Sequence, residues 1–75
     1  MSKTFFDYSK LKGRIVEVFG SQKAFTKAFG VTESTLSQKL NGRTYFMQTE
    51  IFKIAKLLQI SPEDISAYFF TQRVQ

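Results

Sequence analysis

Five hydrogen-bonding side chains between residues 33 and 41 form the pattern in this sequence that is best suited to recognition chemistry. On a helix they fall on one side, opposite Leu36 and Leu40. Glutamine can pair with adenine, glutamate can accept from cytosine, and serine can bond to several base edges. The set consists of Glu33, Ser34, Ser37, Gln38 and Asn41. This stripe favours a helix that lies in the major groove of DNA, and an ordinary solvated helix face is the alternative.

Two short helices are expected to position this stripe. Ser21 and Thr32 are good N-caps for helices over residues 22–29 and 33–40. Gly30 ends the first helix, and Asn41-Gly42 ends the second. Two short helices joined by a tight turn that contains glycine are the layout of a helix-turn-helix. The sequence therefore predicts a reading unit over residues 21–42.

The rest of the chain is expected to support this unit with three more helices. Apolar spacing predicts one helix over residues 8–19 and another over 48–58, where Phe52 and Leu57 broaden the buried stripe. Ser61-Pro62 begins a fifth helix that ends near Tyr68, and residues 69–75 could form an extended C-terminal tail. We expect one all-α domain over residues 1–75. Its expected core residues are Phe25, Phe29, Leu36, Leu40, Ile51, Ile54 and Leu58.

Composition narrows the classes of function. The 75 residues contain no cysteine and no histidine, so we expect no metal site, no cofactor and no enzymatic activity. No stretch approaches the length of a membrane span, and we expect a cytoplasmic protein without a membrane partner. The net charge is +5, and the whole excess falls within residues 1–43. A basic half points to nucleic acid as the partner.

The stretch Ser21–Gly42 resembles the helix-turn-helix of lambda-type phage repressors and Cro proteins. That family carries Ser or Thr followed by Gln, a glycine turn, two hydroxyl residues three apart, and a final Asn-Gly, and all of these are present here without a gap. The resemblance covers about residues 10–66. It implies a five-helix lambda-repressor-like fold in a Cro-like transcriptional regulator of a bacteriophage, acting in the bacterial host. Double-stranded operator DNA is the implied partner, read as two half-sites by a homodimer.

The resemblance also implies roles for single residues. The residues implied to contact base edges are Glu33, Ser34, Ser37 and Gln38. The residues implied to contact the DNA backbone are Gln22, Thr35, Asn41, Arg43 and Lys10. Two positions depart from the family. Glu33 stands where glutamine is frequent, and Leu40 stands where some members carry an acid that pairs with an arginine of the first helix.

The aromatic residues near both ends leave two alternatives open. Exposed apolar patches usually mark an interface, so we expect Tyr68, Phe69 and Phe70 to contact a second copy or a partner, through the fifth helix or a strand over residues 68–74. Alternatively, the two ends of the chain pack on each other and complete the core. An aromatic interface also favours a second function, namely a phage modulator that binds a repressor protein rather than DNA. A nonspecific nucleic-acid binder is a third possibility, which would leave the polar stripe without a purpose.

Overall fold

The computed structural model describes residues 6–72 and shows five helices with no strand in that range. The helices are α1 (Ser9–Phe19), α2 (Gln22–Phe29), α3 (Glu33–Leu40), α4 (Gln48–Leu57) and α5 (Ile65–Phe69), and a 3₁₀ turn, η1 (Pro62–Asp64), precedes α5. The all-α prediction is confirmed. No helix of the described range is long and apolar enough to cross a membrane.

Local capping explains why α2 and α3 begin and end where they do. The Ser21 hydroxyl accepts a hydrogen bond from the Ala24 N–H at 3.0 Å, and the Thr32 hydroxyl accepts one from the Thr35 N–H at 3.1 Å. These bonds satisfy N–H groups that have no partner within the helix. Gly30 ends α2 with φ of 91°, a left-handed conformation that glycine adopts without strain.

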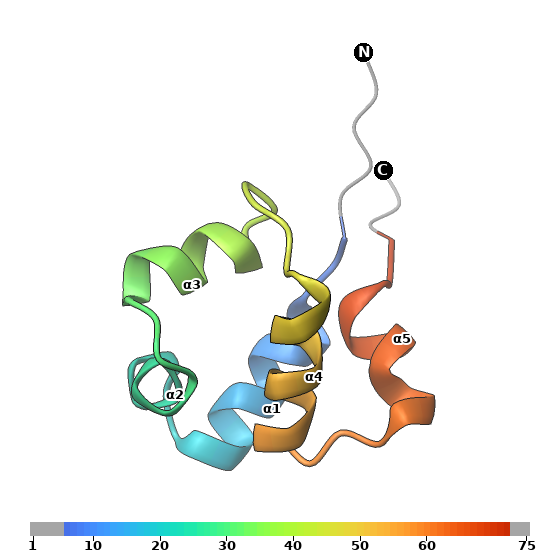
Figure 1. Ribbon diagram of the computed structural model, residues 1–75, viewed down its shortest axis with the longest axis horizontal. Helices are drawn as coiled ribbons and strands as arrows, with labels where there is room; N and C mark the ends of the chain where they lie inside the picture. Colours follow the sequence, from blue (N-terminus) through green and yellow to red (C-terminus); the bar gives the residue numbers. More distant parts are fainter. Residues whose placement is uncertain (1–5, 73–75) are drawn as a thin grey trace.

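The core lies where α1 and α4 meet the other helices. In Figure 1, α2 and α3 lie on one side of this pair, and α5 lies on the opposite side. The seven expected core residues are all buried, and Leu40 packs in the core as an apolar side chain. Phe52 differs from the expectation: it is 58% exposed because it lies on the outer side of α4.

The two ends of the described chain lie side by side. The Asp7 N–H donates to the Thr71 carbonyl at 2.6 Å, and Phe6 forms a single antiparallel bridge with Gln72. The Phe6 ring meets the Phe70 ring edge-on at 5.8 Å. The alternative that the ends pack on each other is therefore confirmed for the described residues.

The predicted tail needs a correction. Helix α5 continues through Phe69, so residues 68 and 69 are helical rather than extended. Within the described range, the residues after α5 contribute one bridge to Phe6 and no edge strand. Residues 73–75 of the predicted tail lie outside the described residues.

Candidate functional site

The polar stripe lies on the outer side of α3. Its five residues are all exposed, as the sequence predicted. In Figure 1, α3 runs along the edge of the molecule, with no other helix on its outer side. Part of the stripe forms a shallow polar depression with the loop that follows. We call this surface the α3 face, defined by Glu33, Ser34, Ser37, Gln38, Asn41 and Arg43.

The end of α3 brings Arg43 to this face. The Arg43 N–H donates to the Gln38 carbonyl at 2.9 Å, so the chain folds back over the last turn of the helix. Gly42 allows this path because its φ is 79°. The Asn41 side-chain amide donates to the Ser37 hydroxyl at 3.2 Å. The structure thus gathers Ser37, Gln38, Asn41 and Arg43 on one surface, as the sequence suggested.

Lys39 belongs to α3 but not to the α3 face. It is 9% exposed, and its ammonium lies 3.1 Å from both the Glu50 carboxylate and the Tyr45 carbonyl oxygen. The positive charge of Lys39 is therefore paired with Glu50 inside the molecule and does not contribute to the α3 face. On the α3 face the charged groups are the Arg43 guanidinium and the Glu33 carboxylate, which leaves no net positive charge there.

Glu50 completes this internal network. Its carboxylate also accepts the Met47 N–H at 2.8 Å, which caps the start of α4. Burial raises the pKa of Glu50, but the hydrogen bonds from Met47 and Lys39, together with the Lys39 charge, outweigh burial and lower the pKa below its ordinary value of 4.5. The network fixes the path of residues 41–47 between α3 and α4.

The other residues implied to contact the DNA backbone are more scattered. Gln22 is exposed at the start of α2, whereas Thr35 is half-buried and its hydroxyl accepts a hydrogen bond from Thr32. The Lys10 ammonium lies 4.8 Å from the centre of the Tyr68 ring, beside α5. Helices α3 and α5 lie on opposite sides of the molecule, so Lys10 is not brought together with the α3 face (Figure 1).

The aromatic residues predicted to form an interface separate into three environments. Phe69 is 1% exposed and belongs to the core, so its assignment to a partner surface is wrong. Tyr68 is half-buried beneath Lys10, and Phe70 is 49% exposed. The large aromatic core explains the correction: α5 turns Phe69 inward against Phe46, with ring centres 5.5 Å apart.

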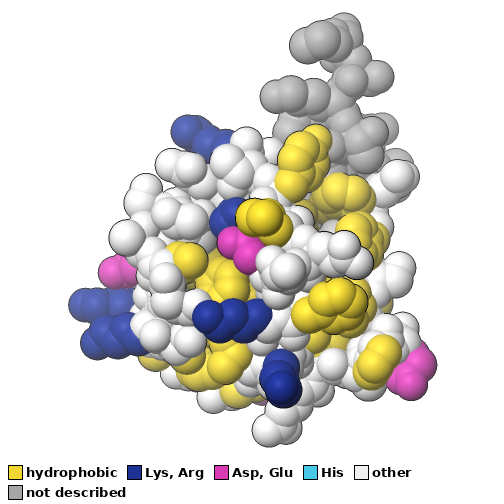
Figure 2. All heavy atoms as spheres, in the orientation of Figure 1, with side chains coloured by type: hydrophobic (Ala, Val, Ile, Leu, Met, Phe, Trp, Pro, Cys, Tyr) yellow, Lys and Arg dark blue, Asp and Glu magenta, His cyan; other side chains and the backbone are white. Residues whose placement is uncertain are grey.

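Sequence reasoning assigned no interface role to Tyr45 and Met47, the most exposed large apolar side chains of the described residues. Tyr45 is 75% exposed and Met47 is 64% exposed, both in the loop before α4. Figure 2 shows apolar side chains gathered over α4 and α5 on this face of the molecule. The signal was present in the sequence, since Tyr45, Phe46 and Met47 are three large apolar residues in a short loop. Only Phe46 of these three is buried.

Comparisons with known proteins add a relative and a family. The solution structure of the modulator of repression (MOR) of the temperate bacteriophage TP901-1 from Lactococcus lactis is similar to this chain, with a TM-score of 0.79 and 41% sequence identity. The match covers 93% of this chain and 95% of that one. No curated protein matches the sequence. A family model matches residues 4–72, and the chain belongs to that family, which is described as "Protein of unknown function (DUF739)".

Proposed function

We propose that this protein is a phage regulator that acts in the host cytoplasm by binding a phage repressor protein. The observation that carries the proposal is the 41% identity, over 93% of the chain, to a modulator of repression. At that identity and coverage, a shared mode of action is a reasonable inference. The proposal corresponds to the second function that the sequence suggested.

The charge on the α3 face supports this choice. Affinity for DNA comes largely from cations that neutralise phosphates. Lys39, the cation within α3, is paired internally with Glu50, and Glu33 adds a negative charge to the face. A surface with one arginine and one glutamate is poorly suited to bind DNA on its own. It is well suited to polar contacts with another protein.

Direct operator binding in a lambda-repressor-like helix-turn-helix is the second candidate. The observation that favours it is the unbroken exposed stripe on α3, whose glutamine and serine side chains suit base edges. Under this function the Arg43 guanidinium would contact the DNA backbone, and a homodimer would read two half-sites.

A single titration series separates the two candidates. The purified chain is added to the DNA beside its own gene, to scrambled DNA, and to the repressor encoded in the same genome. We expect measurable affinity for the repressor, altered occupancy of operator DNA by the repressor, and no preference of the chain alone for either DNA.

Preference for the native DNA by about a thousandfold, without the repressor, would favour operator binding instead. In that case Gln38→Ala should remove the preference, whereas Arg43→Ala should weaken binding to both DNAs alike. Failure to bind the repressor under any of these conditions contradicts the modulator proposal.

A further inference from the structure

A shallow polar depression lies on the α3 face. It encloses about 300 Å³ and opens to solvent. Its lining residues are Ser34, Ser37, Gln38, Asn41 and Arg43. All five side chains can donate hydrogen bonds, and Arg43 is the only charged residue among them. Small-molecule sites are mostly apolar, so a depression with this lining is better suited to a polar side chain of a protein.

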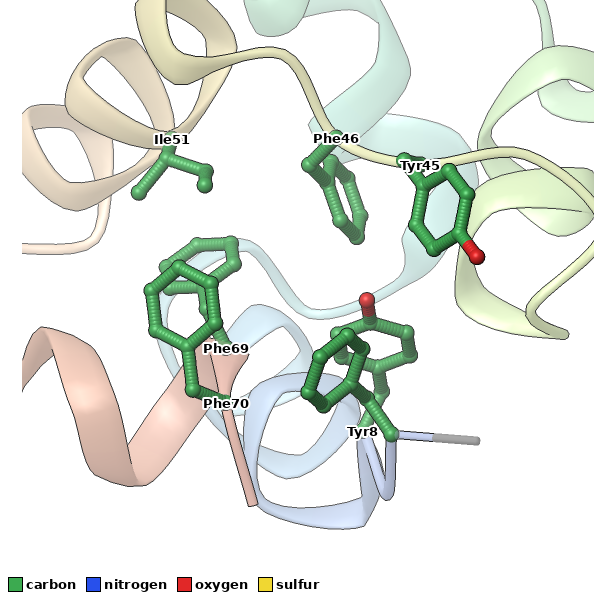
Figure 3. A pocket seen from close by; sticks show the side chains of 7 residues that line it. Tyr8, Tyr45, Phe46, Ile51, Phe69 and Phe70 are labelled. Atoms are coloured by element: carbon green, nitrogen blue, oxygen red, sulfur yellow. The ribbon is translucent and has the colours of Figure 1, made fainter. Parts of the chain in front are cut away.

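A second hollow, between the two ends of the described chain, is much smaller. It encloses about 40 Å³, and Figure 3 shows the rings of Tyr8, Phe46 and Phe69 packed around it. A single water molecule needs roughly 10–15 Å³, so this hollow has room for a few waters and not for a large side chain. Of the two features, only the polar depression has space for a side chain of a partner.

The backbone of Arg43 is fixed beside the depression, whereas its guanidinium is unpaired. The Arg43 N–H donates to the Gln38 carbonyl, and Gly42 provides the turn with φ of 79°. The Arg43 side chain makes no ion pair or hydrogen bond with any described residue. An anion that binds here would therefore displace no internal partner and would lose little affinity to ordering the backbone.

Two serines and a glutamine add neutral donors to the depression. The Ser37 hydroxyl accepts the Asn41 amide at 3.2 Å, which leaves the hydroxyl proton available for donation. The side chains of Ser34 and Gln38 have no hydrogen-bond partner among the described residues. An ionised carboxylate only accepts hydrogen bonds, and it can take a bidentate pair from one arginine together with further donors. One carboxylate therefore matches both the charge and the donors of the depression.

The position of Glu33 favours an acidic side chain over DNA as the occupant. Glu33 begins α3 and Asn41 follows its last residue, and a rise of about 1.5 Å per residue places the two about 12 Å apart along the helix. Exposed charges are largely screened beyond about 8 Å at physiological salt, so Glu33 hardly repels a single carboxylate beside Arg43. Duplex DNA carries a negative charge about every 1.7 Å and would bring phosphates to Glu33 as well as to Arg43.

We propose that the polar depression of the α3 face binds the carboxylate of one aspartate or glutamate side chain of the phage repressor. The Arg43 guanidinium donates two parallel hydrogen bonds to the carboxylate, and the serine hydroxyls and the Gln38 amide supply donors for the acceptor sites that remain. This inference rests on the proposed function and adds to it the contact surface and the chemistry of the residue that is bound.

The first arm of the test measures the affinity of the full chain for the repressor encoded in the same genome. Arg43→Met should weaken binding by about tenfold or more, because the carboxylate loses its charged partner. Arg43→Lys should recover only part of the affinity, since an ammonium cannot form the two parallel bonds. Lys56→Met is the matched control: it removes an equal charge from the exposed side of α4, outside the depression, and should weaken binding far less. Circular dichroism and urea unfolding check that each variant retains the fold.

The second arm identifies the bound residue by exchanging the two charges. Arg43→Glu is titrated with repressor variants in which single surface aspartates or glutamates are replaced by lysine. We expect one such replacement to abolish binding to the wild-type chain and to restore binding to Arg43→Glu. A rescue confined to one position reports a direct pair, because an effect of overall charge would be similar for every replacement.

The outcomes separate this inference from the proposed function. If the repressor binds Arg43→Met as tightly as the wild-type chain, or if Arg43→Met and Lys56→Met weaken binding equally, the depression is not the contact surface, while the modulator function stands. If the repressor does not bind the wild-type chain at all, the proposed function fails and this inference fails with it.

Three further results would overturn the named contact. Full affinity in Arg43→Lys would show that a point charge is sufficient and that no bidentate pair forms. Failure of every lysine replacement to rescue Arg43→Glu would contradict a single carboxylate as the occupant. If the chain alone binds scrambled DNA, and Arg43→Met abolishes that binding but leaves repressor binding unchanged, the occupant is a DNA phosphate.

Discussion

The Lys39 ammonium lies 3.1 Å from the Glu50 carboxylate and joins the end of α3 to the start of α4. The same ammonium donates to the Tyr45 carbonyl, and the same carboxylate accepts the Met47 N–H. One ion pair therefore sets the loop that carries Arg43 to one surface and Tyr45 to another. A loss of function after mutation of Lys39 would reflect this positioning, not a direct contact with a partner.

Replacement of Lys39 by methionine should destabilise the protein by about 1–3 kcal/mol, because a partly buried carboxylate loses its charged partner. Urea unfolding monitored by circular dichroism measures the change. Lys56→Met is the control, since Lys56 is exposed on α4, and it should change the free energy of unfolding by less than about 0.5 kcal/mol. The double variant Lys39→Met with Glu50→Leu should recover much of the loss, because no unpaired charge remains. Equal losses in Lys39→Met and Lys56→Met would contradict the role of the pair.

Stability should also fall at acidic pH through Glu50. Its pKa in the folded protein is lowered, so the folded state binds the proton less tightly than the unfolded chain. The stabilisation is therefore complete above the ordinary pKa of 4.5 and is lost as the pH falls through the lower folded value. Glu50→Gln should be less stable than the wild type at neutral pH and should show a flatter dependence at acidic pH. Parallel pH profiles for the two proteins would show that Glu50 does not contribute in this way.

Phe69 and Phe70 are neighbours with opposite environments. Phe69→Ala should cost about 3–5 kcal/mol, because it empties a core site that is 1% exposed. Phe70→Ala should cost much less, since that ring is half-exposed and packs edge-on against Phe6. Thermal unfolding of both variants provides the comparison. Similar melting temperatures would mean that Phe69 is not buried in the core while Phe70 lies at the surface.

Two glycines should respond to alanine in opposite directions. Gly30 has φ of 91°, and Gly30→Ala should destabilise the protein by about 1 kcal/mol or more through backbone strain. A steric clash is not the cause, because an added Cβ would lie 3.9 Å from its nearest atom, the Lys53 ammonium nitrogen. Gly13 lies inside α1 with open space around it, so Gly13→Ala should stabilise by about 0.5–1 kcal/mol. Chemical denaturation of the two variants measures whether Gly30→Ala lowers the free energy of unfolding and Gly13→Ala raises it.

The parts of the fold that depend on neighbouring residues could be predicted from the sequence. The limits of α2 and α3 follow from Ser21, Gly30 and Thr32, which act within a few residues of themselves. The exposure of the polar stripe follows in the same way from the helical period. Lys39 could be placed on α3 but not inside the molecule, because its partner Glu50 lies on another helix.

The aromatic residues show even more clearly that contacts between distant parts of the sequence cannot be predicted from local patterns. Whether Phe69 or Phe70 faces the core depends on how α5 packs against Phe46 and Phe6, which lie far away in the sequence. Phe52 fits the buried stripe of α4 by period, yet its side chain is 58% exposed. Residue types alone could indicate a surplus of aromatics, but only the packing of distant elements decides which of them remain exposed.

The pairing of Asp7 with Thr71 has a consequence for the order of events during synthesis. Helices α1 to α4 leave the ribosome before α5 does. The contact between the two ends of the described chain cannot form until Phe70 and Gln72 have also emerged and met Phe6. A nascent chain would therefore present the α3 face before the surface formed by Phe6 and Phe70 is complete.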